Sequence, residues 1–301
     1  PPSGSLRDLT SELIAFAAGS HHGQFDCIDE DGKDGYQHRQ TAADIGYGEA
    51  KAAFLSRCAT EAELDTLFMA AVEEMAQAME RFRPIAGTDE EMLFQYAMLS
   101  RQILSAVIDG DRRDTAEFCL GISIPHQVKE ESALWQRCLR KVENRLQSFT
   151  DESEINRARR TISDRCKAAA KWGAGIYRLN IPTGGGKTLA ALRYALATAA
   201  EHEKQRIIFV IPLLSILDQN AKVIREYLDD DKLILEHHSN VIQEKSGDKL
   251  DENELLMETW AAPVVITTLV QLLNTLFSGK PSCIRRIAAL RDSVIVIDEV
   301  Q

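Results

Sequence analysis

The run Leu179-Asn180-Ile181-Pro182-Thr183-Gly184-Gly185-Gly186-Lys187-Thr188 decides the fold of the second half of the chain. A short apolar strand is expected to enter this run, and an Ala- and Leu-rich helix over 188–202 is expected to leave it. Three glycines let successive backbone N–H groups turn inward around a phosphate chain, and the dipole of the following helix adds positive potential. The alternative is an ordinary glycine turn before a helix.

Each residue type in this loop suits a nucleotide. The ammonium of Lys187 is expected to reach the β- and γ-phosphates, and the hydroxyl of Thr188 is expected to hold Mg²⁺. The form Pro-Thr-Gly-x-Gly-Lys-Thr, with Ile181 where the strict motif has its first glycine, is the form used by superfamily 2 helicases. We therefore predict ATP and magnesium as cofactors, bound by Pro182, Thr183, Gly184, Gly185, Gly186, Lys187, Thr188 and Asp298.

Three short β-branched runs, over 206–211, 264–268 and 293–297, are continuous, as buried parallel strands are. Helical patterns lie between them, so the alternation predicts a layered α/β sheet. The last run ends in two carboxylates. Asp298 can bind magnesium directly or through water, and Glu299 can orient the attacking water and accept its proton. The predicted catalytic residues are therefore Lys187, Asp298 and Glu299.

Two further segments follow a strand and open a helix, over 211–220 and 265–271. Hydroxyls, amides and helix-start N–H groups in such places can hold the backbone phosphates of a single strand without reading its bases. The alternative is that they are strand-to-helix caps. The predicted nucleic-acid contacts are Gln219, Thr267, Thr268 and Gln271.

The first half of the chain has helical periodicity. Helices are expected over 6–18, stopped by Gly19; over 49–82, in more than one helix; over 90–108; and over 132–149. The Gly- and Asp-rich stretch 23–46 is expected to be a loop.

An adjacent histidine pair, His21 and His22, follows the first of these helices. Asp109 and Asp111 are expected at the end of the third helix. Histidines with a carboxylate can hold iron, manganese, nickel or cobalt, and a pair of such ions can activate water for phosphodiester hydrolysis. The alternative is exposed histidines and an ordinary capping aspartate.

Composition limits the class of protein. The chain has 301 residues and a formal net charge of -11, which excludes a wholly basic nucleic-acid binder but leaves room for a local basic groove. No apolar run reaches about 18 residues, so we expect no membrane span, and the first five residues do not form a signal peptide. The six cysteines form no C-x-x-C pair, which favours reduced thiols in a cytoplasmic protein.

Taken in order, these segments resemble the helicase–nucleases of type I CRISPR systems, which join a histidine–aspartate (HD) nuclease domain to two RecA-like motor domains. Within that family the chain looks most like the subtype I-C branch. The resemblance rests on residues 20–23 and 104–118 in the helical half, and on 155–159, 182–188, 207–220, 237–240, 264–271 and 298–301 in the motor.

The resemblance implies an all-helical HD-type domain with a linker over 1–148, followed by a RecA-like parallel sheet flanked by helices over 149–301. His21, His22 and Asp111 match the family's metal ligands, with Asp109 as the alternative to Asp111. The implied activity is ATP-dependent, 3'-to-5' translocation on single-stranded DNA, joined to metal-dependent cleavage of that strand. The implied partner is an RNA-guided surveillance complex that opens the target DNA.

The chain departs from the family pattern at both ends. The family's earlier histidines and its histidine–aspartate dyad have no match before Ser20, and the second motor domain has no match before Gln301. We therefore expect neither activity to be complete in these 301 residues alone. Two other functions stay open: another superfamily 2 motor with a helical accessory domain, and a non-catalytic docking fragment.

Overall fold

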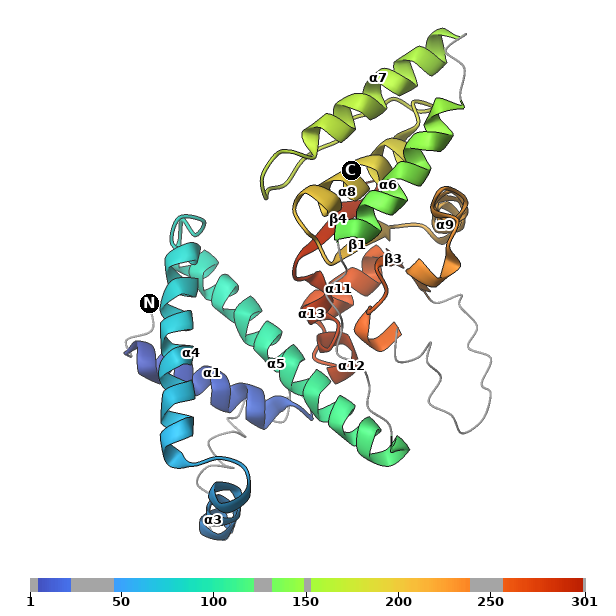
Figure 1. Cartoon of the computed structure of the whole chain (residues 1–301). Coiled ribbons are helices and arrows are strands. Elements are labelled where there is room, and N and C mark those ends of the chain that lie inside the picture. Colours follow the sequence, from blue (N-terminus) through green and yellow to red (C-terminus); the bar gives the residue numbers. More distant parts are fainter. Residues whose placement is uncertain (1–4, 23–45, 122–131, 149–152, 239–256, 300–301) are drawn as a thin grey trace. The chain divides into compact units, whose positions relative to one another are not determined.

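The computed structural model describes residues 5–22, 46–121, 132–148, 153–238 and 257–299. The chain divides into two compact units, one within residues 1–120 and 279–285 and the other within 121–278 and 286–301. Figure 1 shows the helices of the first unit that lie within residues 6–120 in blue to green, and the sheet of the second unit in gold to red. The loop expected over 23–46 lies almost wholly outside the described residues.

The first unit is helical. Its helices are α1 (Leu6–Ser20), α3 (Tyr47–Arg57), α4 (Glu61–Phe82), α5 (Asp89–Leu120) and the short α12 (Pro281–Ile284). Capping boxes begin α1 at Ser5 and α4 at Thr60, where each side chain accepts a hydrogen bond from the third helical residue. Helix α1 packs on α4 and α5.

One predicted boundary in this unit is wrong. The sequence predicts that the helix begun near Glu90 ends at Asp109-Gly110-Asp111, but α5 continues through these residues to Leu120. A glycine inside a long helix costs only about 1 kcal/mol relative to alanine, so the neighbouring turns carry the helix across Gly110. Asp109 and Asp111 therefore lie on the surface of a continuous helix.

The second unit contains four strands, β1 (Arg206–Ile211), β2 (Ile234–His237), β3 (Val264–Thr268) and β4 (Ser293–Ile297). All pair in parallel in the order β2-β3-β1-β4, with Ile208 of β1 opposite Val265 of β3 and Ile295 of β4. The predicted strands β1, β3 and β4 are confirmed. Strand β2 was not expected, because two of its four residues are polar.

Alternate residues of β1 divide between two apolar cores, as the twofold period of a strand requires. Ile207, Phe209 and Ile211 belong to one core, with residues of α6 (Ser132–Gln147), α8 (Lys187–Glu201) and α9 (Leu214–Leu228). Ile208 and Val210 belong to the other, with residues of α11 (Leu269–Phe277) and α13 (Ile287–Leu290). The sheet is therefore covered on both faces, which confirms the predicted combination of helical and RecA-like parts.

Two further described elements belong to the unit: α7 (Glu154–Ala169), which packs on α8, and a 3-10 turn, η2 (Asp231–Leu233), before β2. The strand expected to enter the phosphate loop does not form, because residues 175–186 are irregular and Leu179 is 42% exposed. This segment belongs to none of the four described strands.

The helix α6 packs on α8 and α9 and so belongs to the second unit. The predicted boundary between two domains after residue 148 stays a prediction, because compact packing units need not coincide with domains. In the described part of the chain none of the five cysteines forms a disulfide, and no helix has the length and apolar character needed to cross a membrane.

Candidate functional site

The phosphate loop owes its shape to its three glycines. Gly184 and Gly186 have φ angles of 80° and 81°, which L side chains rarely adopt. A Cβ on Gly185 would lie 2.5 Å from Cγ2 of Ile181 and 2.9 Å from the backbone oxygen of Pro182. The loop turns directly into α8, whose first residues are Lys187 and Thr188 and whose N-terminus has no side-chain cap. Backbone N–H groups at such an end can receive an anion.

The predicted catalytic residues lie together. Nζ of Lys187 is 2.9 Å from Oε1 of Glu299 and 3.9 Å from Oδ1 of Asp298, although more than a hundred positions separate them in the sequence. The hydrogen bond to Glu299 raises the pKa of Lys187, and the negative charge of Asp298 adds to this effect. Lys187 and Glu299 are each more than one-third exposed, so solutes can reach the ion pair.

A buried asparagine joins the loop to the acidic pair. Asn220, on α9, accepts a hydrogen bond from Oγ1 of Thr188 at 2.8 Å and donates one to Oδ2 of Asp298 at 3.2 Å. Asn220 is only 8% exposed. Asn220 is the last residue of the segment 211–220, which the sequence predicts to open a helix. Its role as a link could not be predicted, because Thr188 lies 32 positions before it and Asp298 lies 78 positions after it.

The turn after β4 fixes the positions of the carboxylates of Asp298 and Glu299. The backbone N–H of Asp298 donates to the oxygen of Val210, which extends the pairing of β4 with β1 by one residue. Glu299 then adopts a φ of 52°, and its N–H donates to Oδ1 of Asp298 at 3.0 Å. A non-glycine residue with positive φ is uncommon and is often found at functional sites. This turn places both acids at the carboxyl edge of the sheet, where ligands of parallel sheets bind.

Helix α7 supports the loop from the other side. Nε of Arg159 donates to the backbone oxygen of Gly184 at 2.8 Å. A cavity of about 410 Å³ lies beside it, and its lining includes Asn156, Arg159, Gly186, Leu189 and Tyr227. Residues 155–159 contribute to the resemblance to CRISPR helicase–nucleases, but the sequence alone predicts no role for Arg159.

The cavity ends on a buried ion cluster. Arg193 of α8 donates to both carboxylate oxygens of Glu143 on α6, at 2.6 and 2.8 Å, and to Asp164 on α7 at 2.6 Å. Burial acts to raise the pKa of Glu143, but hydrogen bonds from Arg193 and Lys167 outweigh it and lower the pKa. One guanidinium therefore ties three helices together beside the phosphate loop.

The predicted nucleic-acid residues differ in exposure. Gln219 on α9 is exposed. Thr267 is fully buried and donates to the backbone oxygen of His237, and Thr268 caps α11 by accepting from the N–H of Gln271. Oε1 of Gln271 accepts from Arg286 at 2.9 Å. Capping, the alternative reading of this segment, is thus present at Thr268, and contact of the four residues with a nucleic acid stays a prediction.

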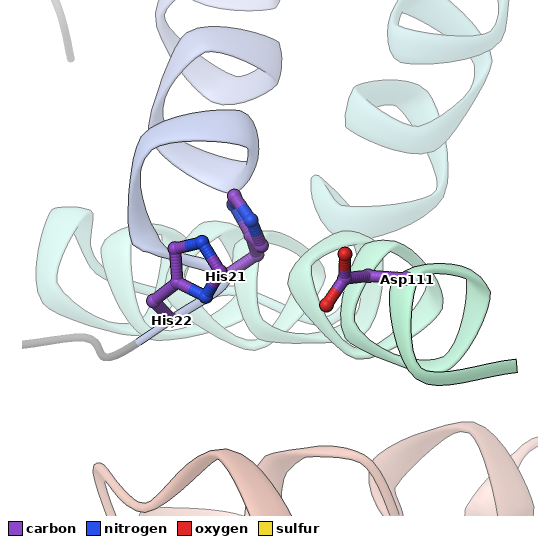
Figure 2. Close-up of side chains that lie close together, drawn as sticks. All are labelled: His21, His22 and Asp111. Carbon is purple, nitrogen blue, oxygen red and sulfur yellow. The ribbon is translucent and has the colours of Figure 1, made fainter. Parts of the chain in front are cut away.

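The histidine pair and Asp111 come together in the helical unit (Figure 2). One ligand atom from each of His21, His22 and Asp111 lies within 4.8 Å of the others. Nδ1 of His21 is 2.6 Å from the carbonyl oxygen of Ala18. Because a carbonyl oxygen only accepts, Nδ1 donates in this contact, and Nε2 is the ring nitrogen that is left to face a metal.

Asp109 has other contacts. Its carboxylate accepts from Nε of Arg285 at 2.7 Å and pairs with Arg113 at 3.2 Å, and Arg285 is almost fully buried. Asp111 faces the histidines in Figure 2. The geometry therefore favours Asp111 over Asp109 as the third member of the cluster.

Comparison with known proteins finds a family model that matches the second half of the chain, and solved structures that share the fold of the whole chain. Residues 161–301 match the DEAD/DEAH box helicase family. The CRISPR-associated nuclease/helicase Cas3 of Haloferax volcanii is 26% identical over 182 residues, which cover 51% of this chain and 19% of that protein.

Crystal structures of T. fusca Cas3 and of T. fusca Cas3-ATP share the fold, with TM-scores of 0.52 and 0.51 and identities of 19% and 17%. Each comparison covers 100% of this chain and 34% of the solved one. The resemblance to CRISPR helicase–nucleases is confirmed, while the subtype stays a prediction.

Proposed function

We propose, from the premise that the chain is Cas3-like with a DEAD/DEAH box helicase region at residues 161–301, that it is part of an ATP-driven single-stranded DNA translocase joined to a metal-dependent nuclease. The observation that carries the motor part is the convergence of Lys187, Thr188, Asp298 and Glu299 on one edge of the sheet.

The side chains at this edge suit the hydrolysis of a nucleoside triphosphate. Lys187 would exchange its contact with Glu299 for the β- and γ-phosphates. Thr188 and Asp298 offer the hard oxygen ligands that magnesium prefers, and Asn220 holds the two in a fixed relation. Magnesium, when bound, would neutralise charge that develops on the phosphates. Glu299, once released from Lys187, would orient a water molecule and accept its proton.

The cavity between α7 and α8 gives this nucleotide a place for its base. Its wall includes Gly186, the last residue of the phosphate loop, so a nucleotide with phosphates in the loop can reach it. The apolar side chain of Leu189 offers a surface for a base, and Asn156 offers a hydrogen-bonding amide.

The helical unit would contribute His21, His22 and Asp111 to the nuclease site. Two imidazoles and a carboxylate suit iron, manganese, nickel or cobalt, and these three residues would hold such an ion, which would supply activation of water for cutting a phosphodiester. Only three ligands are present among the described residues, so the site in the native protein would need further ligands from elsewhere. We propose that the displaced strand reaches it after an RNA-guided complex opens the target, in a cytoplasmic setting.

Asp298→Asn tests the motor part. The variant should retain ATP, because the glycine loop and Lys187 remain, but its turnover should fall at least about a hundredfold, because magnesium placement loses a charge. Asp292→Asn is the matched control, since Asp292 lies in the exposed turn before β4 and pairs only weakly with Arg291. ATP binding and hydrolysis are measured on the native protein, and unchanged hydrolysis in Asp298→Asn would remove this residue from the site.

A different superfamily 2 motor, with a helical accessory domain, is the second candidate. The metal content of the native protein separates the two. A transition metal lost on substitution of His22 supports the nuclease, whereas normal ATP hydrolysis without any such metal supports the other motor.

A further inference from the structure

A second group of metal-ligating side chains lies in the sheet unit, away from the phosphate loop. Asp218 comes from the first half of α9, and Glu236 and His238 come from the end of β2 and the residue after it. One ligand atom from each lies within 4.8 Å of the others. The group stands at the carboxyl edge of a parallel sheet, where strand ends and helix starts converge on ligands.

Arg225 fixes the orientation of Glu236. Its Nε donates to Oε1 of Glu236 at 2.9 Å, and its Nη2 lies 2.8 Å from the same oxygen. This arrangement leaves Oε2 turned toward Nε2 of His238, whose side chain is only 6% exposed. Ligand carboxylates and imidazoles in metal sites are held by such neighbours, which fix them before the ion binds.

The separation of the histidine and glutamate suits a shared ion better than a direct bond. Nε2 of His238 and Oε2 of Glu236 are 3.5 Å apart, which is long for a hydrogen bond between a nitrogen and an oxygen. Two ligands about 2.1 Å from a tetrahedral zinc ion are about 3.4 Å from each other. Asp218 is exposed, so its carboxylate can move toward the other two without breaking a packed contact.

We propose that Asp218, Glu236 and His238 bind a divalent ion of the zinc class, with water in the open position. The site is separate from the cluster of His21, His22 and Asp111. Its ion ties the start of α9 to the end of β2. Gln219, one of the predicted nucleic-acid contacts, directly follows Asp218, so the ion would also fix the part of α9 that carries it.

The test uses the full chain with His22→Ala and Asp111→Asn, which remove ligands of the first cluster. Zn²⁺ binding is measured by equilibrium dialysis, and the shift of the thermal unfolding temperature with added Zn²⁺ is measured in parallel. We expect one Zn²⁺ per chain in this background and at least about a tenfold weaker affinity after Asp218→Asn. Glu201→Gln removes an exposed carboxylate at the end of α8 and should leave the affinity unchanged.

Asp218→Asn is the decisive variant, because the exposed side chain can be replaced without disturbing the core. His238→Gln removes the nitrogen ligand, and Co²⁺ added in place of Zn²⁺ should then lose its tetrahedral absorption. The proposal is overturned if the background chain binds no Zn²⁺, or if Asp218→Asn binds it as tightly as the background. Either result would mean that Glu236 makes only local polar contacts with Arg225 and His238.

Discussion

At the scale of single residues, Asp109 and Asp111 show how two carboxylates two positions apart acquire different roles. Asp109 is held by Arg285 and Arg113, whereas Asp111 faces the histidine pair. The helical pitch turns the two side chains about 200° apart around α5, which explains why only one of them reaches the histidines.

Substitution of each aspartate by asparagine separates these roles. Asp111→Asn should lower the bound transition metal of the native protein at least about tenfold and leave its unfolding unchanged. Asp109→Asn should keep the metal but lower the free energy of unfolding by about 1–3 kcal/mol, because charge-assisted hydrogen bonds to Arg285 and Arg113 are lost. Metal analysis and urea unfolding measure the two effects, with the exposed Asp114→Asn as control. The opposite pattern would make Asp109 the ligand.

At the scale of elements, the helices around the phosphate loop depend on one buried guanidinium. Arg193 lies where α6, α7 and α8 meet, and Arg159 of α7 reaches from there to the loop at Gly184. The position of α7 is therefore linked to the shape of the nucleotide site through contacts between side chains.

Arg193→Met should destabilise the protein by about 1–3 kcal/mol, because it removes charge-assisted hydrogen bonds to the half-buried Glu143, which keeps only Lys167 of its two cationic partners. The same change should weaken ATP binding, since α7 loses its anchor on α8. Arg291→Met breaks an exposed pair with Asp292 and should cost less than about 1 kcal/mol. Chemical unfolding and nucleotide titration check both effects, and an Arg193→Met protein as stable as the wild type would show that the cluster is not an anchor.

The end of β2 gives the protein a dependence on pH. Nδ1 of His237 accepts a hydrogen bond from Nε1 of Trp260 at 2.9 Å. Burial, together with the positive charge of Arg286 and the neighbouring His238, lowers the pKa of His237 to about 4 from its usual 6.5. The imidazole is thus neutral in the folded protein at pH values where the unfolded chain would already bind a proton.

Because the folded pKa is lowered, the contribution of His237 to stability is full above pH 6.5 and falls as the pH falls toward 4. The loss between pH 7 and pH 5 should be about 2 kcal/mol. His237→Asn should remove this part of the slope, since an amide oxygen can accept from Trp260 and does not titrate. Unfolding by urea at several pH values measures it, and an equal slope in both proteins would show that other groups cause the dependence.

At the scale of the whole molecule, the sequence identified what depends on local composition. Strands β1, β3 and β4 were predicted because each is a short, continuous, β-branched run. Strands β1 and β3 are buried along their whole length, whereas Ile295 and Ile297 of β4 are exposed. The phosphate loop was predicted from its three glycines. In the structure two of them have positive φ, and the third leaves no room for a Cβ beside Ile181. The acidic pair could be assigned to the same site because parallel strands end at one edge.

Features that depend on distant partners could not be predicted in this way. Strand β2 is stabilised by its pairing with β3, which no local pattern indicates. Helix α5 continues through Gly110 because the helical turns on both sides of it are stable. The strand expected before the loop is not among the four strands that the structure describes. Asn220 and Arg193 act through partners 29 to 78 positions away, and no local pattern distinguishes them.

The measurement that tests the central claim most directly is DNA-stimulated ATP hydrolysis by the native protein carrying Lys187→Ala. Lys187 is the group that links the phosphate loop to Asp298 and Glu299, so hydrolysis should fall at least about a hundredfold, while metal-dependent nicking of single-stranded DNA persists. Lys171→Ala, an exposed lysine between α7 and the loop, should hydrolyse ATP normally. Hydrolysis at the wild-type rate in Lys187→Ala, or nicking lost together with hydrolysis, would contradict the assignment of a separate ATP site to this edge of the sheet.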